Sequence, residues 1–490
     1  MLRLRKNRML MVMLIVFVIA IVGLSGIISD ASNGRDEKFI SGLRIDPPHE
    51  RDFKNIDKYF ALARDLGMGY IKMGIIWDYV EPEDDVWTWK GNATLSGPEA
   101  RGRKVGRARG RRAQESQGER PGADSSFDYD YIATLSQKYN ISVIPMFLRS
   151  RKGTRERDPV EYAEYIYTFI KRYHQSMNFR VIEFQNEPNA DNDGSGGGRN
   201  WEGTAADLAK VGSAVYEKVK SEYPRIMIGT SGFITGSKKM IETNTNKFYA
   251  AYFLASPKFD VFLFHDYPKN MSYTQGTSAG NLASQYHNFD TYRNLLNHHG
   301  YHDKPILVTE GNEEKRGFSD GEVATQYVAS FIMAKVNAEK NRVMGKFISN
   351  GIMSSNANAL INEKTGQRTN QFEVVRQIIT FLSEYPLHSR HIAGEINSEH
   401  YWVEEFKNRD GKKSWVAFCP LLYETKDGLR PKDLEIVKKV HKYPQTVTLN
   451  VGSSKSVKIT NILDGQTQII NAKNGKVAFS LNEIPVLVEE

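Results

Sequence analysis

Short apolar runs alternate with amphipathic stretches along most of the chain. Runs of strand character end near Ile45, Ile75, Phe147, Phe184, Ser231, Phe264, Thr309 and Gly351. Between them, apolar residues recur at helical spacing, as in 52–66, where Phe53, Ile56 and Phe60 share one face. Strands that alternate with helices are typical of a parallel sheet. The pattern therefore predicts a (β/α)8 TIM barrel over residues 39–385.

Several predicted helices carry recognisable capping residues. Asp158 precedes Pro159, which is a favourable pair at a helix start. Thr204 with Asp207, and Ser319 with Glu322, have the spacing of a capping box. We therefore expect helices to begin at these three places.

The pattern changes near Pro386, where helical spacing gives way to short strands. Asp410-Gly411, Asp464-Gly465 and Asn474-Gly475 interrupt these strands. Such dipeptides are strong hairpin signals. We predict a C-terminal antiparallel β-sandwich over residues 386–490.

The N-terminus has the features of an export segment. An uncharged, apolar run over residues 9–28 follows a basic start over residues 1–8. A helix of that length matches the roughly 30 Å of a bilayer core. A cleaved signal peptide is the alternative, because Ser29 and Ala31 are small enough for a cleavage site. Both interpretations of residues 1–30, a signal anchor or a signal peptide, place the rest of the chain outside the cytoplasm, in the periplasm or at the cell surface.

The net charge of +8 comes from two segments. Lys and Arg number 66 against 58 Asp and Glu, and residues 1–8 and 91–126 each supply half of the excess. Residues 91–126 are rich in glycine and poor in large apolar residues, which predicts a disordered insertion in the barrel. Contact with an anionic polysaccharide or lipid is an alternative role. No aromatic residue separates its arginines and the remainder is neutral, so no nucleic-acid partner is expected. Cys419 is the only cysteine, which excludes an intramolecular disulfide.

Two glutamates follow apolar strands and are candidates for catalysis. Glu187 lies in Gln185-Asn186-Glu187-Pro188, directly after Val181–Phe184, and Glu310 follows Pro305–Thr309. The C-terminal ends of barrel strands form the active-site face. Either glutamate alone is also compatible with a charge at a helix N-terminus. Two carboxylates at this face match what glycosidic bond cleavage requires.

These motifs resemble those of clan A retaining glycoside hydrolases, most closely family 39, which includes bacterial exopolysaccharide-associated endoglycosidases. The resemblance implies that Glu187 is the acid/base and Glu310 the nucleophile, with about 5 to 5.5 Å between the carboxyl groups. It further implies that Asn186 donates a hydrogen bond to the sugar 2-hydroxyl. His265-Asp266-Tyr267 is similar to the clan's His-x-Tyr, in which Tyr267 would orient the nucleophile and His265 would line the cleft, although packing roles are an alternative.

The stretch from Trp77 to Pro82 also resembles a W-x(3)-E-P stretch of these enzymes. Trp77 and Trp201 are candidate platforms for sugar rings, and buried structural roles are the alternative. The chain departs from the clan at two points. Lys72 stands where many members have an arginine on the second strand, and no tryptophan follows the eighth strand.

The sequence thus predicts an exported retaining β-glycosidase that acts on a polysaccharide or oligosaccharide. The favoured subtype is an endo-acting enzyme that cleaves within an exopolysaccharide. Alternatives are an exo-acting β-xylosidase, a family 5-like glucanase, and a catalytically silent carbohydrate-binding protein. The chemistry requires neither a metal nor an organic cofactor. The expected partners are a carbohydrate and, through the N-terminal segment, a membrane. The sequence does not indicate an oligomeric state.

Overall fold

A computed structural model describes residues 39–45, 55–93, 125–148, 157–198, 200–234, 246–266, 281–311, 318–349, 352–354, 359–393, 401–419, 423–425, 436–439 and 443–490. The predicted export segment and most of the basic insertion lie outside these residues. Within them, no helix has both the length and the apolar character needed to cross a membrane.

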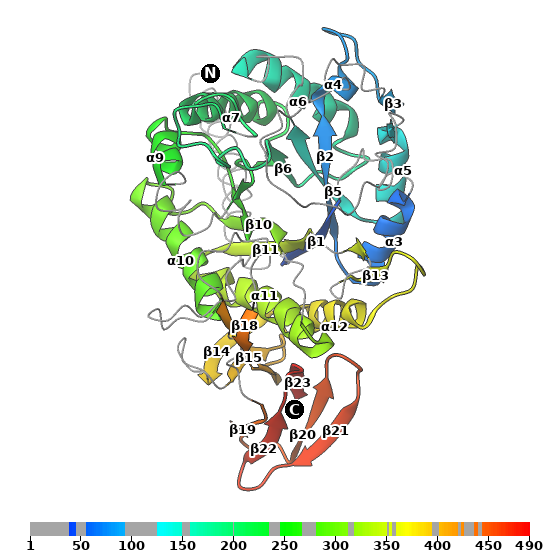
Figure 1. Cartoon of the computed structure of the whole chain (residues 1–490), viewed down its shortest axis with the longest axis vertical. Coiled ribbons are helices and arrows are strands. Elements are labelled where there is room, and N and C mark those ends of the chain that lie inside the picture. The colour runs from blue at the N-terminus through cyan, green and yellow to red at the C-terminus, as the bar shows by residue number, and fades with distance from the viewer. Residues whose placement is uncertain are drawn as a thin grey trace, which may run out of the picture. The chain divides into compact units, whose positions relative to one another are not determined.

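Parallel strands form the first part of the fold (Figure 1). They are β1 (Ile40–Ile45), β2 (Tyr70–Ile76), β5 (Ser142–Leu148), β6 (Val181–Phe184), β7 (Met227–Ile228), β8 (Phe233–Ile234), β9 (Phe262–Asp266), β10 (Ile306–Gly311) and β11 (Val343–Ile348). Their hydrogen-bonded order is β7-β6-β5-β2-β1-β11-β10-β9-β8. β7 and β8 stand at the two ends of this order, yet they follow one another in the chain. Bridges from Gly229 to Val261 and from Asn186 to Gly232 link the same segment to both neighbouring strands. The arrangement is TIM-like, with β7 and β8 in the place of the predicted fifth strand.

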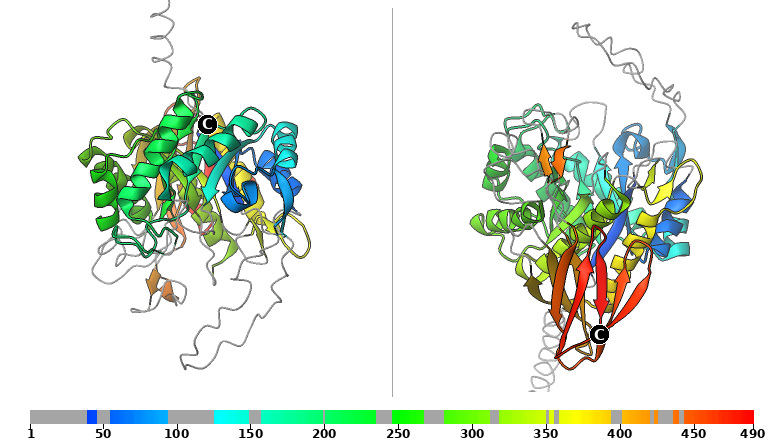
Figure 2. Two further views of the ribbon diagram at one scale, coloured as in Figure 1. Left: turned by 90° about the horizontal axis from the view of Figure 1, so that it is seen from above. Right: turned by 60° about the horizontal axis from the view of Figure 1, so that its bottom comes forward.

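Helices surround these strands, as a second direction of view makes clear (Figure 2). They are α3 (Ile56–Asp65), α4 (Trp77–Val80), α5 (Tyr129–Tyr139), α6 (Pro159–Tyr173), α7 (Ala205–Lys220), α9 (Asn246–Leu254), α10 (Asn281–His298), α11 (Asp320–Lys340) and α12 (Asn370–Glu384). Two short pairs, β3 (Lys90–Ala93) with β4 (Ser125–Asp128) and β12 (Met353–Ser354) with β13 (Ile361–Asn362), lie between them. The predicted helix starts are confirmed. Asp158 caps α6, and both capping boxes are formed at α7 and α11.

Aliphatic and aromatic side chains from different strands share one core inside the parallel sheet. Its members are Ile40, Ile144, Val181, Val261, Leu263, Leu307 and Phe347. Since strand residues alternate between the two sheet faces, the next inward positions toward the C-terminal ends can carry polar groups. In this chain they include Lys72, Glu183 and His265, all buried.

The C-terminal region is antiparallel. One sheet has the order β14 (Leu387–Ala393), β15 (Trp402–Lys407), β16 (Lys413–Phe418), β23 (Val486–Glu489), β20 (Ser456–Asn461) and β21 (Thr467–Asn471), and β19 (Gln445–Asn450) pairs separately with β22 (Lys476–Leu481). A further pair joins β17 (Tyr423–Thr425) to β18 (Ile436–Lys439). Trp415 and Val457 of the larger sheet share a core with Val447 and Phe479 of the β19–β22 pair. These two sheets therefore pack as layers.

Two of the three predicted hairpins are confirmed. Asp410-Gly411 connects β15 to β16, and Asp464-Gly465 connects β20 to β21. The prediction of a hairpin at Asn474-Gly475 is wrong. A tight turn does form there, with Lys473 and Lys476 hydrogen-bonded in both directions. However, β21 pairs with β20 and β22 pairs with β19, so this turn passes the chain from one sheet to the other.

Candidate active site

The sheet register brings four side chains to one place. Arg44 of β1 is the register partner of Lys72 of β2, and His265 of β9 is the partner of Glu310 of β10. Partners on neighbouring parallel strands point to the same face. Arg44, Lys72 and His265 all lie within 3.4 Å of Glu310, so the four side chains converge at the C-terminal ends of the strands, where the carboxylate pair was predicted.

Glu310 is buried and surrounded by basic groups. Its Oε1 lies 3.0 Å from Lys72 Nζ, 3.1 Å from Arg44 Nε and 3.4 Å from His265 Nε2. The β9–β10 register shifts between Val308 and Glu310, an irregularity of the kind that redirects side chains at strand ends. Positive groups this close favour the ionised form of a carboxyl group. Glu310 therefore has the surroundings expected of a nucleophile.

Glu187 sits in a constrained loop after β6. Gln185 and Glu187 both have left-handed backbones, with φ of 59° and 48°, which is unfavourable for residues other than glycine. Hydrogen bonds hold the loop in place. The Glu187 amide donates to the carbonyl of Gly232 at 2.9 Å, and the Asn189 side chain makes two bonds to the backbone of Ile234. The Glu187 side chain keeps 19% of its surface exposed, so it can exchange protons with a ligand or with water.

His265 connects the two glutamates. The ring is fully buried, and its Nδ1 lies 3.0 Å from Glu187 Oε1 while its Nε2 faces Glu310. Burial opposes a charge on the ring and Lys72 also disfavours it, but the carboxylates of Glu310, Glu183 and Glu187 outweigh both. The pKa of His265 is therefore raised above its ordinary value.

The separation of the two carboxylates discriminates between mechanisms. One oxygen of Glu187, one oxygen of Glu310 and one ring nitrogen of His265 all lie within 4.8 Å of one another. Retaining glycosidases hold their carboxyl groups about 5 to 5.5 Å apart, whereas inverting enzymes need about 6.5 to 9.5 Å to admit a water molecule. An oxygen-to-oxygen approach within 4.8 Å is closer to the retaining separation than to the inverting one.

The same three side chains include suitable donor atoms for a divalent cation. However, Lys72 and Arg44 already approach the Glu310 oxygen at 3.0 and 3.1 Å. A metal ion bound there would be repelled by both cationic groups. The donor set therefore fits acid–base and nucleophilic chemistry better than metal binding.

Three residues at this site, Arg44, Lys72 and Glu183, were not among the predicted site residues, and Lys72 is one of the two departures from the clan. Lys72 and Glu183 are both fully buried, with Nζ 2.8 Å from Glu183 Oε1. Burial opposes ionisation of Glu183, but Lys72 and His265 outweigh it and lower its pKa. The available signal was a glutamate inside the apolar run Val181–Phe184, since a charged residue in a buried strand requires a partner.

The structure places the two predicted tryptophan platforms in the protein interior. Trp77 stacks on Tyr165, with ring centroids 4.9 Å apart, and donates to the Glu81 carboxylate. Trp201 donates to the carbonyl of Thr204 at 2.9 Å. Both indoles have no exposed surface, so as sugar platforms they were wrongly assigned.

Of the remaining predicted site residues, Asn186 lies beside Glu187. It is partly buried, and its side-chain oxygen has no hydrogen-bond partner among the described residues. Tyr267 lies outside the described residues.

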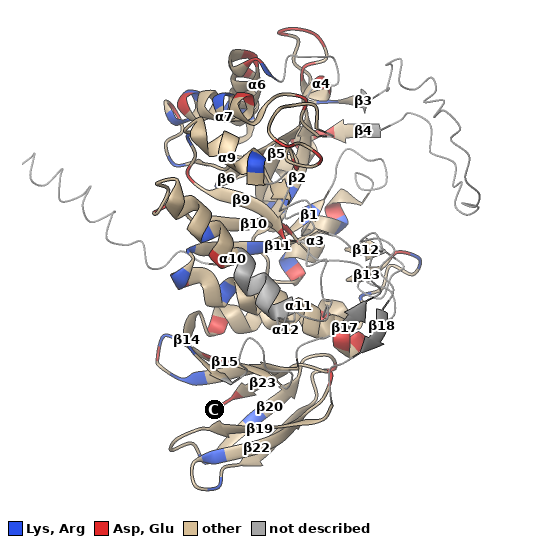
Figure 3. Ribbon diagram, turned by 60° about the vertical axis from the view of Figure 1, so that its left-hand side comes forward, with Lys and Arg blue, Asp and Glu red and all other residues tan. Residues whose placement is uncertain are grey.

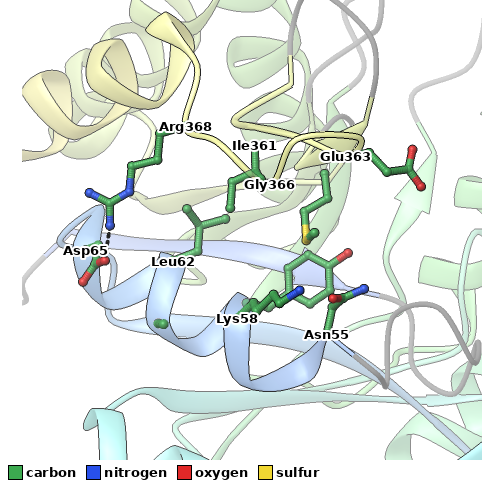
Figure 4. A pocket seen from close by; sticks show the side chains of 11 residues that line it. Asn55, Lys58, Leu62, Asp65, Ile361, Glu363, Gly366 and Arg368 are labelled. Atoms are coloured by element: carbon green, nitrogen blue, oxygen red, sulfur yellow. Dashed lines mark hydrogen bonds and ion pairs between the residues drawn. The ribbon is translucent and has the colours of Figure 1, made fainter.

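A pocket of about 310 Å³ lies elsewhere, between one face of α3 and the β12–β13 region (Figure 4). Asn55, Lys58 and Leu62 of this face contribute to it, and Asp65 is ion-paired with Arg368 at its edge. It shares no residue with the carboxylate pair, and its acidic side chains do not form a second pair. The carboxylate pair of Glu187 and Glu310 is therefore the candidate active site.

Comparison with known proteins supports the fold. No family model and no curated protein matches the chain. A family 39 glycoside hydrolase from the gut symbiont Bacteroides cellulosilyticus WH2 is similar in structure, with a TM-score of 0.60 and 14% identity over 93% of this chain and 81% of that one. The family 39 enzyme from Xanthomonas axonopodis pv. citri gives a TM-score of 0.53 at 10% identity, covering 92% and 93% of the two chains. A 4-O-alpha-L-rhamnosyl-beta-D-glucuronidase from Fusarium oxysporum 12S gives 0.54 at 12% identity, covering 93% and 97%. The similarity confirms a TIM-like fold followed by C-terminal sheets, and the resemblance to clan A glycoside hydrolases holds at the level of the fold.

Proposed function

We propose that this protein is a retaining β-glycosidase in which Glu310 is the nucleophile and Glu187 the acid/base. The observation that carries the proposal is the close carboxylate pair in two different environments. Glu310 is buried against Lys72 and Arg44, whereas Glu187 is partly exposed and contacts His265. Environments of this kind separate the roles of two otherwise identical acids.

In the proposed reaction, the Glu310 carboxylate forms a bond to the anomeric carbon while the glycosidic C–O bond breaks. Glu187 transfers its proton to the departing oxygen. Glu187, now ionised, then takes a proton from water, whose oxygen attacks the anomeric carbon and releases Glu310. His265 contacts both carboxylates and holds them in position through the two steps. The side-chain oxygen of Asn186, which has no partner among the described residues, can accept a hydrogen bond from the sugar 2-hydroxyl.

The proposed substrate class is a polysaccharide or oligosaccharide, with cleavage inside an exopolysaccharide as the preferred subtype. The proteins of similar fold include a 4-O-alpha-L-rhamnosyl-beta-D-glucuronidase and a xylanase, which supports carbohydrate as the substrate class. An exo-acting β-xylosidase and a family 5-like glucanase are the competing subtypes. A glycan panel distinguishes them, because endo action releases a ladder of oligosaccharides and exo action releases one small product. Anomeric configuration followed by NMR tests retention in the same assay.

Export is part of the proposal. Residues 1–30 combine a basic start with an apolar run, which supports transport of the barrel across a membrane and its anchoring there. Fractionation of cells that produce the full chain or the chain without 1–30 tests this. The full chain is expected in the membrane fraction, or outside the cell if the segment is cleaved. Recovery of both forms in the cytoplasm would contradict export.

The decisive test of the catalytic assignment is covalent trapping. A 2-deoxy-2-fluoro glycoside with an activated leaving group should label Glu310, and Glu310→Gln should abolish labelling and reduce kcat at least about 10³-fold. Glu363→Gln, in the pocket beside α3, is the matched control and should retain activity. Sugar binding without labelling or turnover would identify the protein as a silent carbohydrate-binding protein instead.

A further inference from the structure

A buried lysine contacts two carboxylates beneath the candidate active site. Lys72 has no exposed surface, and its Nζ lies 2.8 Å from Glu183 Oε1 and 3.0 Å from Glu310 Oε1. An ammonium group has three donors and no acceptor, so it can serve both carboxylates at once. Lys72 therefore joins the proposed nucleophile to a third glutamate that does not belong to the catalytic pair.

Glu183 explains why a lysine can be buried there. An isolated ammonium in the protein interior would lose its proton, because desolvation disfavours the charged form. Glu183 is equally buried and supplies the counter-charge. Glycine at 232 leaves the space that the Glu183 carboxylate and the His265 ring occupy, since a Cβ at that position would overlap both His265 Nε2 and Glu183 Oε1.

Arg44 also approaches Glu310, but from a more exposed position. Its side chain keeps 16% of its surface accessible, whereas Lys72 keeps none. Solvent screens a charge less effectively as it becomes more buried. Of the two cations, Lys72 should therefore stabilise the ionised form of Glu310 more strongly.

We propose that Lys72, fixed by Glu183, is a positioning residue that orients Glu310 and maintains it as a carboxylate at acidic pH. This inference rests on the proposed glycosidase function. Glu183 holds Lys72 at 2.8 Å and also lies 3.6 Å from His265 Nε2. Among the described residues, the charged and titratable groups that lie around Glu310 include Arg44 from β1, Lys72 from β2, Glu183 from β6, Glu187 from the following loop and His265 from β9.

The test uses the full chain and compares Lys72→Met, Lys72→Arg and the double variant Lys72→Met/Glu183→Gln. The measurement is the pH dependence of kcat/KM, whose acidic limb reports ionisation of the nucleophile in the free enzyme. In Lys72→Met we expect this limb to move up by about 1 to 3 pH units, the usual influence of one nearby opposite charge. Lys72→Arg preserves the charge and should keep the limb close to its wild-type position.

The double variant separates positioning from a purely structural role. It removes both buried charges, so its thermal stability should recover relative to Lys72→Met. Its acidic limb should remain raised, because Glu310 still lacks the ammonium. Recovery of both stability and the wild-type limb would show that Lys72 is only structural and would overturn the inference. If Lys72→Met alone does not fold, the double variant still gives this answer.

Two further measurements complete the design. Lys138→Met removes an exposed ion pair with Asp57, of 2.9 Å, and should leave the limb unchanged. Labelling of wild-type Glu310 by a fluoro glycoside tests the proposed function separately. Labelling of Glu310 together with an unmoved limb in Lys72→Met would refute the inference alone, whereas absence of labelling would refute the glycosidase assignment on which it rests.

Discussion

At the scale of single residues, the site depends on one position that has no side chain. Gly232 lies against both His265 and Glu183, and its carbonyl accepts the amide of Glu187. A methyl group there would push His265 away from the two catalytic candidates. The geometry of the carboxylate pair is thus tied to the absence of a single carbon atom.

We expect Gly232→Ala to lower kcat strongly and to destabilise the fold by about 1 to 3 kcal/mol, the usual cost of overpacking. Gly69→Ala is the matched control, because a Cβ there meets no atom within 4 Å. Activity and urea unfolding of both variants provide the measurement. Equal activity of Gly232→Ala and wild type would mean that His265 is not required in its present position.

His265 should also make stability depend on pH. Its pKa is raised in the folded state, so the ring binds its proton more tightly there than in the unfolded chain. The resulting stabilisation is fully present below the ordinary value of 6.5 and is lost as the pH rises through the higher, folded-state pKa. The difference in unfolding free energy between wild type and His265→Gln should therefore shrink over the interval from pH 6.5 upward. A difference that stays constant over this interval would contradict the raised pKa.

Residue chemistry was predictable from the sequence only where it depends on neighbours in the chain. Glu187 and Glu310 follow apolar strands, and that local context identified them. The role of Lys72 depends on Glu183 and Glu310, which are remote in sequence and meet it only through the closure of the sheet. Trp77 and Trp201 were misassigned for the same reason, because the partners that bury an indole come from tertiary packing.

At the scale of elements, the strand pair β14–β15 contains two buried acids, Glu404 and Glu405, that contact different sets of side chains. Glu404 accepts hydrogen bonds from His388, His391 and Trp402. Glu405 is contacted by Ser389 and Arg390 instead. The ladder shifts register between His388 and Arg390, so that His388 and His391 both reach Glu404 despite their spacing of three.

We expect Glu404→Gln to destabilise the protein by about 1 to 3 kcal/mol, because an amide nitrogen would replace an acceptor that faces N–H donors. Glu373→Gln, which affects an exposed ion pair with Arg376 on α12, is the control and should stay within about 0.5 kcal/mol of wild type. Thermal and urea unfolding measure both. An unchanged unfolding free energy for Glu404→Gln would show that these hydrogen bonds contribute little.

Elements were predictable where local signals define them. Capping at Asp158, Thr204 and Ser319 depends on residues within one turn, and all three helix starts were correct. The Asn474-Gly475 turn also forms, but which strands pair beside it depends on the shared core of two sheets. Local turn chemistry contains no information about that choice.

At the scale of the whole molecule, basic and acidic residues are equal in number once residues 1–8 and 91–126 are set apart. Basic and acidic residues are both spread over the helices that surround the parallel strands (Figure 3). The excess of positive charge belongs to residues 1–8 and 91–126, most of which lie outside the part that the structure describes. A neutral body has no long-range attraction for polyanions, which favours recognition of a glycan through local contacts in the site.

The residues from Ile40 to Glu490 form one compact unit, although barrel and sheets differ in architecture. Thr325 of α11 donates to the carbonyl of Glu483, Gln377 of α12 donates to that of Ile462, and Phe381 packs edge-on against Phe406. Separate unfolding of the sheets would break these contacts and expose apolar surface of α12. We therefore expect a single cooperative transition in urea. Loss of enzyme activity should coincide with the fluorescence change of buried Trp415, for which Trp415→Phe is the control.

A chain that ends at residue 385 should unfold at a lower urea concentration than the full chain, because the apolar surface of α12 is no longer covered by the C-terminal sheets. Two separated transitions, or a truncated chain as stable as the full one, would show that the barrel does not depend on the C-terminal sheets.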